Sequence, residues 1–92
     1  MQYVGSMTLE RDAKVFAALS DPVRLGLVHE LRSRGQACGK DLSESLGISL
    51  SLVCHHARVL AEAGLLNKTK NGTTAVYTLN APSLRDCLDT LD

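Results

Sequence analysis

Polar side chains recur along one stretch of the chain at spacings that would place them on one side of a helix. Ser51, His55, Arg58 and Glu62 are separated by four, three and four residues, and an α-helix completes a turn about every 3.6 residues. The first three can donate or accept hydrogen bonds. A helix that presents them together is suited to a partner with an ordered array of hydrogen-bonding groups, such as the base edges of a major groove.

Three cysteines offer a second kind of chemistry. Cys38, Cys54 and Cys87 are widely spaced and contain no CxxC pair, which indicates reduced thiols and neither a disulfide framework nor a zinc ribbon. Thiols bind soft ions and are sites of oxidation. Free cysteine is also one of the most frequently buried residue types, so packing explains each cysteine equally well. Both interpretations stay open at this point.

A catalytic site is the competing interpretation of these residues. Cys54 precedes His55 and His56, an order that resembles a thiol nucleophile next to a base. However, adjacent residues on a helix point in different directions and rarely form a useful hydrogen bond. The sequence contains no Gly-rich phosphate loop, paired carboxylate site or metal-hydrolase motif. We therefore expect that the protein is not an enzyme.

Helix boundary signals place these residues in a defined order of elements. Asp21-Pro22 predicts a helix start and Gly35 its end. A third, short helix ends at Leu46-Gly47, and Ser49 is expected to cap a fourth that extends to about Ala63. The third helix is expected to bury Leu42 and Leu46, and the fourth to bury Val53, Ala57, Leu60 and Ala61.

Two extended runs follow the fourth helix. Residues 65–70 and 73–79 are joined by Asn71-Gly72, a pair that favours a tight hairpin turn with positive φ at both positions. This turn would pair Lys70 with Thr73 and would place Leu66 opposite Tyr77. Lys68 and Lys70 would then lie near the hairpin tip, within reach of a phosphate or a minor groove.

The order of elements predicts a mainly α fold with a small β-hairpin wing, an α+β winged helix-turn-helix with five helices. The first helix, from Leu9, and a last helix, introduced by Pro82 and Ser83, each carry an apolar stripe with too little partner surface in so short a chain. We expect a homodimer formed through these two helices. One domain is predicted, residues 9–92, after a flexible N-terminal arm, residues 1–8.

The charge distribution supports a nucleic-acid partner although the formal net charge is zero. Residues 1–44 carry six basic and six acidic side chains, and residues 86–92 carry three Asp. Residues 45–85 carry four basic side chains against Glu62 alone. The stretch expected to read DNA is therefore net positive.

Nothing in the sequence predicts a membrane location. There is no apolar run of about 18 residues, and residues 1–10 have neither a basic leader nor an apolar core. We expect a cytoplasmic protein that binds double-stranded operator DNA. The predicted DNA contacts are Ser49, Ser51, Leu52, His55, His56, Arg58, Lys68, Lys70, Asn71 and Thr73.

Three segments of the sequence resemble those of the ArsR/SmtB family of bacterial repressors: ALSDPVRL at 18–25, HHARVL at 55–60 and AGLL at 63–66. Together with the Asn-Gly wing, they cover about residues 9–91. The resemblance implies homodimers that release operator DNA when a metal ion, a metalloid, or a reactive sulfur species or oxidant engages cysteines or histidines. It also implies dimerisation through the first and last helices.

The resemblance is incomplete at the sensing positions. Where family members that sense arsenite, cadmium or lead often have Cys-x-Cys-Asp-Leu, this chain has Cys-Gly-Lys-Asp-Leu at 38–42. The zinc site found on the last helix of other members needs histidines that are missing here. Leu50 and Leu52 also occupy positions that are usually polar in the family, and one of them is a candidate for contact with a thymine methyl group.

The sequence therefore predicts a sequence-specific DNA-binding repressor released by a thiol-directed signal, with Cys38, Cys54 and Cys87 as candidate switch residues. No cofactor is certain, and a thiophilic ion such as arsenite or a soft metal, bound by the cysteines, is one option beside reactive sulfur or an oxidant. A winged-helix protein-interaction module and a regulator without a small-molecule inducer are the alternatives. Steep salt dependence would distinguish DNA binding from a protein-interaction role.

Overall fold

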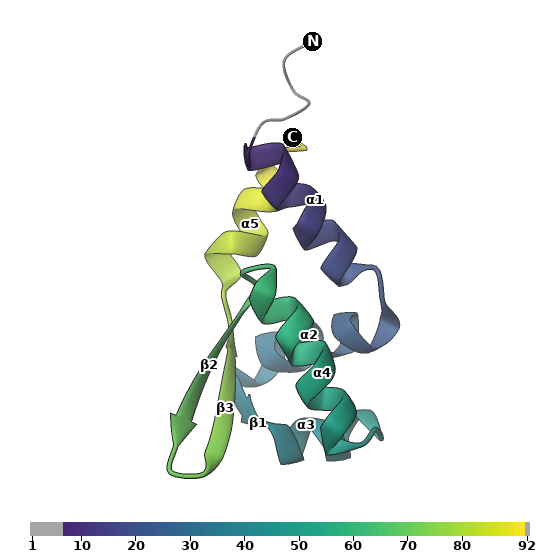
Figure 1. The fold of residues 1–92 in the computed structure, drawn as a ribbon, viewed down its shortest axis with the longest axis vertical. Helices are drawn as coiled ribbons and strands as arrows, with labels where there is room; N and C mark the ends of the chain where they lie inside the picture. The colour runs from purple at the N-terminus through teal and green to yellow at the C-terminus, as the bar shows by residue number, and fades with distance from the viewer. Residues whose placement is uncertain (1–6, 92) are drawn as a thin grey trace.

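The computed structural model describes residues 7–91, and these form five helices and three strands (Figure 1). In chain order they are α1 (Met7–Leu19), α2 (Pro22–Arg34), β1 (Gln36–Cys38), α3 (Gly39–Leu46), α4 (Leu50–Glu62), β2 (Leu66–Asn71), β3 (Thr74–Leu79) and α5 (Ala81–Asp89). The predicted winged helix-turn-helix is confirmed. The predicted arm lies outside the described residues except for residues 7 and 8, which belong to α1. Among the described helices, none has the length and apolar character needed to cross a bilayer.

The helix boundaries follow the capping residues that the sequence indicated. Asp21 accepts hydrogen bonds from the backbone N–H groups of Val23 and Arg24, at 2.9 and 3.1 Å. Pro22 occupies the first turn of α2, where a missing N–H costs nothing. Gly35 ends the helix with a φ of 84°, a conformation that favours glycine.

The turn between α3 and α4 is fixed by side chains on both of its sides. The Ser43 hydroxyl donates to the carbonyl of Ile48, and Gly47 adopts the left-handed conformation, with a φ of 66°. Ser49 accepts a hydrogen bond from the Leu52 N–H at 3.1 Å and so caps α4. These contacts fix where α4 begins after α3, and the cap at Ser49 agrees with the prediction.

The sheet contains a strand that the sequence analysis did not predict. Its order is β1-β3-β2, all antiparallel, and β1 pairs Ala37 with Tyr77 and Cys38 with Val76. Three residues are too few to show the alternation by which a strand is recognised in a sequence. Because β1 runs directly into α3, it ties the helix-turn-helix to the wing.

The expected register of the hairpin was wrong. Asn71 pairs with Thr74, so Gly72 and Thr73 form the turn. Within residues 7–91 no residue other than glycine has a positive φ, and Gly72 has a φ of 69°. Glycine as the first of two turn residues is typical of a type II′ turn, whereas the predicted type I′ turn needs positive φ at both.

The register error moves each cross-strand partner by two residues. Leu66 lies opposite Leu79, and Lys68 lies opposite Tyr77. A shift of two keeps every side chain on its face of the sheet. Leu66 and Tyr77 therefore still share the inner face, and both are buried.

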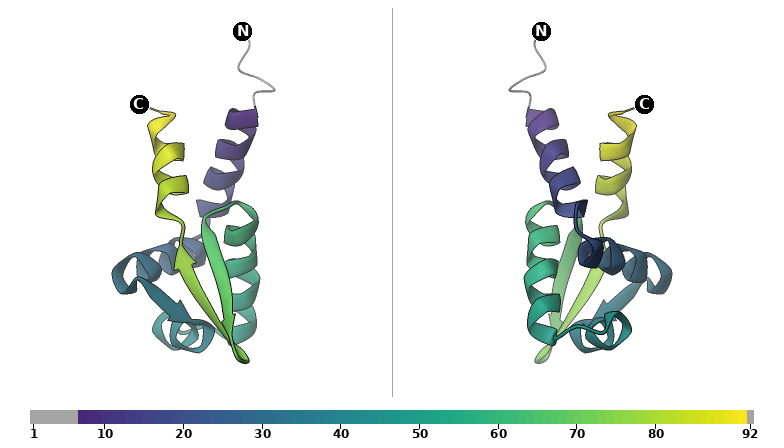
Figure 2. Two further views of the ribbon diagram at one scale, coloured as in Figure 1. Left: turned by 90° about the vertical axis from the view of Figure 1, so that its left-hand side faces the viewer. Right: turned by 90° about the vertical axis from the view of Figure 1, so that its right-hand side faces the viewer.

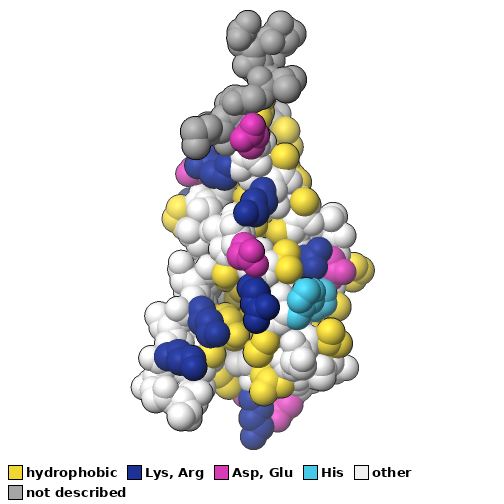
Figure 3. Space-filling model, viewed as in Figure 1, with side chains coloured by type: hydrophobic (Ala, Val, Ile, Leu, Met, Phe, Trp, Pro, Cys, Tyr) yellow, Lys and Arg dark blue, Asp and Glu magenta, His cyan; other side chains and the backbone are white. Residues whose placement is uncertain are grey.

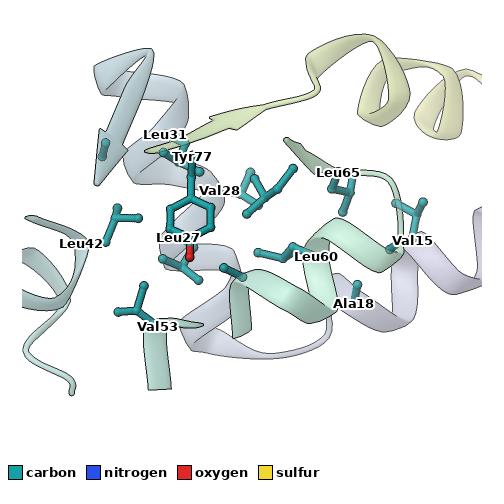
Figure 4. Packing of buried hydrophobic residues seen from close by; sticks show 14 of the residues in the cluster. Val15, Ala18, Leu27, Val28, Leu31, Leu42, Val53, Leu60, Leu65 and Tyr77 are labelled. Atoms are coloured by element: carbon teal, nitrogen blue, oxygen red, sulfur yellow. The ribbon is translucent and has the colours of Figure 1, made fainter. Parts of the chain in front are cut away.

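One apolar core connects these elements (Figure 4). It extends from Val15 and Ala18 on α1, past Leu60 on α4, to Leu42 on α3, with the ring of Tyr77 inside it. The inward side of α4 consists of Val53, Ala57 and Leu60, as predicted. Ala61 was also expected to face inward but is exposed, and Leu46 is only partly buried.

Helices α1 and α5 extend together from one end of the molecule, away from the sheet (Figure 2). Leu88 and Leu91, on and just after α5, are 52% and 71% exposed. On α1, Val15 and Ala18 face the core, while Ala13 and Ala17 are exposed. Both terminal helices thus present apolar residues that the protomer does not cover.

Leucine truncations test which contacts stabilise this fold. We expect Leu60→Ala to lower the free energy of unfolding in urea by about 2–5 kcal/mol, because a fully buried side chain leaves a cavity in the core. Leu25→Ala is the matched control, since Leu25 is 53% exposed, and it should change the same quantity by less than about 0.5 kcal/mol. Equal losses in the two variants would contradict the assignment of the core.

Candidate nucleic-acid interface

The outer face of α4 carries the polar side chains that its spacing predicted. Ser51, His55, Arg58 and Glu62 are all exposed, because the opposite side of the helix is buried in the core. Figure 3 shows basic side chains over α4 and over the hairpin of β2 and β3 on the same side of the molecule. The helix and the wing thus form one surface with a positive character.

His56 is placed apart from the other predicted contacts. Its side chain is only 14% exposed, and its Nδ1 lies 3.1 Å from Nη1 of Arg24 and 3.9 Å from Oδ2 of Asp21. Arginine can only donate, so Nδ1 is the acceptor in the contact with Arg24. His56 therefore connects α4 to α2. The ring of its neighbour His55 packs edge-on against it, with 5.1 Å between the ring centroids, and His55 remains exposed.

Arg24 extends this connection to the first helix. Its Nε donates to the carbonyl of Ala18 at 2.6 Å, at the end of α1. The hydrogen bonds from the backbone N–H groups of Arg24 and Val23 hold the pKa of Asp21 below its ordinary value, so its carboxylate stays charged beside them. The Asp-Pro-x-Arg motif thus joins α1, α2 and α4. The sequence alone did not indicate this role, because His56 is 32 residues away from Arg24.

The remaining predicted contacts lie around the wing and the start of α4. Lys68, Lys70, Asn71 and Thr73 are exposed near the hairpin tip. Ser49 is exposed too, but its hydroxyl oxygen already serves as the cap of α4. The structure therefore gathers nine of the ten predicted side chains on the exposed surface of α4 and the wing, and leaves His56 beneath it.

A hollow of about 360 Å³ lies between α4, the start of α3 and the wing. Three lysines line it: Lys68 and Lys70 from β2, and Lys40 from α3. The sequence analysis did not include Lys40 among the predicted DNA contacts. Lys40 lies beside the wing because the pairing of β1 with β3 places the start of α3 next to β3.

Two of the three cysteines line the same hollow. Cys38 is partly buried at the end of β1, and Cys54 is exposed on the flank of α4. Beside Cys54, burial raises the pKa of the Tyr77 hydroxyl above its ordinary value, and the neighbouring thiol raises it further.

Cys87 is far from this hollow. It lies on α5, at the end of the molecule opposite β1 and α3 (Figure 1), and is 1% exposed. Its sulfur donates a weak hydrogen bond to the carbonyl of Asp12 at 3.8 Å. Burial, and then the negative charge of Asp12, raise the pKa of the Cys87 thiol. One protomer therefore does not bring all three thiols together.

No ready-made metal centre is present among the described residues. Within residues 7–91, no three side chains of His, Cys, Asp or Glu gather closely enough to hold one metal ion. A soft ion bound within one protomer would thus have at most the two thiols of the hollow as sulfur ligands.

The comparison with known families decides the class of the protein. The family model described as bacterial regulatory protein, arsR family, matches residues 21–68, which are 48 of the 92 residues. The matched segment includes α2, the helix-turn-helix and the start of the wing. The chain belongs to the ArsR family. Its members are DNA-binding transcriptional regulators and not enzymes, which agrees with the prediction made from the sequence.

Individual relatives agree with this assignment over most of the chain. The arsenical resistance operon repressor of Bacillus subtilis is 35% identical over 80 residues, which are 87% of this chain and 76% of the relative. An ArsR-like transcriptional regulator from Rhodococcus sp. RHA1 superposes with a TM-score of 0.82, at 31% identity, over 91% of this chain and 78% of the other.

A third similarity concerns the fold. A homodimeric winged helix-turn-helix DNA-binding domain from Mycobacterium bovis superposes with a TM-score of 0.78, over 90% of this ArsR-family chain and 77% of the other. Its sequence identity is 21%. It therefore shows that the fold is shared.

The three thiols are expected to react at very different rates. Ellman's reagent should modify the exposed Cys54 first and Cys38 more slowly, because the thiolate must be reached by the reagent. Cys87 should react only after unfolding in denaturant, since it is buried and its pKa is raised. Cys54→Ser should remove the fast phase and leave the slow one. A fast phase that instead disappears in Cys87→Ser would contradict the burial of Cys87 described above.

Proposed function

We propose that the protein is a homodimeric transcriptional repressor whose two α4 helices enter successive major grooves of operator DNA. The observation that carries the proposal is the single exposed surface formed by Ser51, His55 and Arg58 on α4 and by the lysines of the wing. The α4 residues are suited to base edges and to phosphate, and the wing lysines to the phosphates of the flanking groove. The similarity to the arsenical resistance operon repressor supports this role.

The dimer would form through α1 and α5, where apolar residues remain uncovered. A protein of 92 residues gains little stability from so small a core, and covering Leu88 and Leu91 would add to it. Two recognition helices bind one DNA face only if they are separated by about 34–36 Å, one turn of the duplex. The homodimeric domain from Mycobacterium bovis supports dimerisation of this fold.

The signal that ends repression would act on Cys38 and Cys54. Both line the hollow between α4 and the wing, whereas Cys87 is buried elsewhere. The three lysines of the hollow repel a divalent cation and attract an anion. The hollow therefore suits a neutral or anionic thiol reagent, such as arsenous acid or a polysulfide, better than a divalent metal ion.

The position of the hollow suggests how thiol chemistry would release DNA. A DNA strand separates the major groove entered by α4 from the minor groove approached by the wing, so its phosphates would pass across the hollow. An adduct on Cys54, or a link between Cys54 and Cys38, would occupy that path. Release would then follow from direct exclusion of the DNA backbone, with no change in the core.

Substitutions on the proposed surface should separate phosphate contacts from base contacts. We expect Arg58→Ala and Lys70→Ala to weaken binding to all sequences about equally, and each to reduce the slope of log K against log salt by about 0.9. Ser51→Ala and His55→Ala should instead alter sequence preference. Selection from a random duplex library, followed by salt titrations of the selected duplex, measures both effects.

Lys14→Ala is the charge-matched control for this experiment, because Lys14 is exposed on α1 and does not line the hollow. Sedimentation velocity establishes that this variant keeps the oligomeric state of the unmodified protein. Its salt slope should equal that of the unmodified protein. The proposed surface is wrong if all four variants keep unchanged affinity, slope and preference. If the unmodified protein binds no duplex at low salt, the repressor role itself fails.

Serine substitutions should locate the switch. We expect arsenite or polysulfide to lower operator affinity by tenfold or more in the unmodified protein and in Cys87→Ser, and to have little effect on the Cys38→Ser/Cys54→Ser double variant. Fluorescence anisotropy of a labelled operator duplex measures the release. Release that persists in the double variant and disappears in Cys87→Ser would place the switch on α5 instead. A protein that binds its operator and ignores both reagents would be a regulator without a thiol signal.

A further inference from the structure

Leu52 is a large, exposed apolar side chain at the edge of the polar face of α4. It is 47% exposed and lies on the first turns of α4. At 3.6 residues per turn, Leu52 lies about 60° around the helix from His55 and about 100° from Ser51. It therefore extends the surface formed by those two residues, which the proposed function lays in the major groove.

Leu50 provides an internal comparison on the same turn. It is 52% exposed, but it lies about 140° around the helix from His55. Its Cδ1 approaches the backbone of Gly39 so closely that a Cβ there would lie 2.9 Å away. It also lines the hollow between α4 and the wing. Leu50 thus packs against α3, on the flank of α4 away from Leu52.

The chemistry of the major groove offers one apolar group to such a side chain. Adenine, guanine and cytosine present hydrogen-bond donors and acceptors there, and thymine adds its 5-methyl group. A leucine placed against a polar edge would remove water from that edge without replacing its hydrogen bonds, which is unfavourable. Against a methyl group, the same leucine buries apolar surface on both sides.

Resting on the proposed function, we propose that Leu52 reads a thymine methyl group and so determines part of the operator sequence. The basic side chains of α4 and of the wing, which Figure 3 shows on one side of the molecule, favour a polyanion over an apolar protein surface as the partner of this face. Each half-site would then carry a thymine next to the bases contacted by Ser51 and His55.

Deoxyuridine tests this contact because it lacks only the 5-methyl group. A duplex selected from a random library would be prepared with each thymine replaced in turn by deoxyuridine. We expect one position in each half-site at which this replacement weakens binding about fourfold per methyl group, the factor associated with burying one group of that size. Fluorescence anisotropy of each duplex measures the effect.

Variants of the protein then assign the contact. Leu52→Ala should bind the thymine and deoxyuridine duplexes equally at that position, and Leu52→Met, which keeps an apolar side chain of similar reach, should retain the discrimination. Leu50→Ala is the matched control, since it makes the same change at similar exposure, and it should also retain the discrimination. Circular dichroism and sedimentation velocity establish that all variants keep their fold and oligomeric state.

Three results would overturn the proposal. The first is that the unmodified protein binds every deoxyuridine duplex as tightly as the thymine duplex. If binding is still sequence-specific, this result leaves the repressor role intact. Another is an unchanged deoxyuridine penalty in Leu52→Ala. The third is a changed sedimentation coefficient in Leu52→Ala alone, which would assign Leu52 to a protein contact. Absence of binding to any duplex would instead be a failure of the proposed function.

Discussion

The burial of one side of α4 is the constraint on which the rest of the structure depends. Val53, Ala57 and Leu60 are almost completely enclosed, and their spacings of four and three residues fix the rotation of the helix about its axis. Once that rotation is fixed, the opposite face must be exposed. The same packing that stabilises a small protein thus also determines which side chains of α4 are available to a partner.

Local signals predicted much of this arrangement, and contacts between distant residues account for what they missed. The caps at Asp21 and Ser49 depend on neighbours two or three residues away, so the sequence indicated them correctly. The strand β1 exists because it pairs with β3, some 40 positions later in the chain. The hairpin register depends on which residues occupy the turn, and Asn71-Gly72 is compatible with two choices.

The two adjacent histidines show the same limit within the site itself. Consecutive residues differ by about 100° around a helix, so if His55 points outward, His56 must point along the flank. The spacing therefore indicated two different environments, but it did not indicate what His56 would meet. Its partners are Arg24 and Asp21 at the start of α2, and Arg24 in turn reaches the end of α1. A polar network thus joins a terminal helix to the helix that carries the exposed surface.

The cysteines illustrate how a three-stranded sheet changes the chemical interpretation of a sequence. The sequence offered three thiols as candidate switch residues and did not indicate which of them lie together. The pairing of β1 with β3 brings the start of α3, with Cys38 and Lys40, to the hollow that holds Cys54. Two thiols among three lysines favour neutral or anionic reagents over divalent cations, because every cation that enters must overcome the same repulsion. In the proposed complex those lysines also bind phosphate, so a reagent on the thiols and a DNA strand would compete for the same charges.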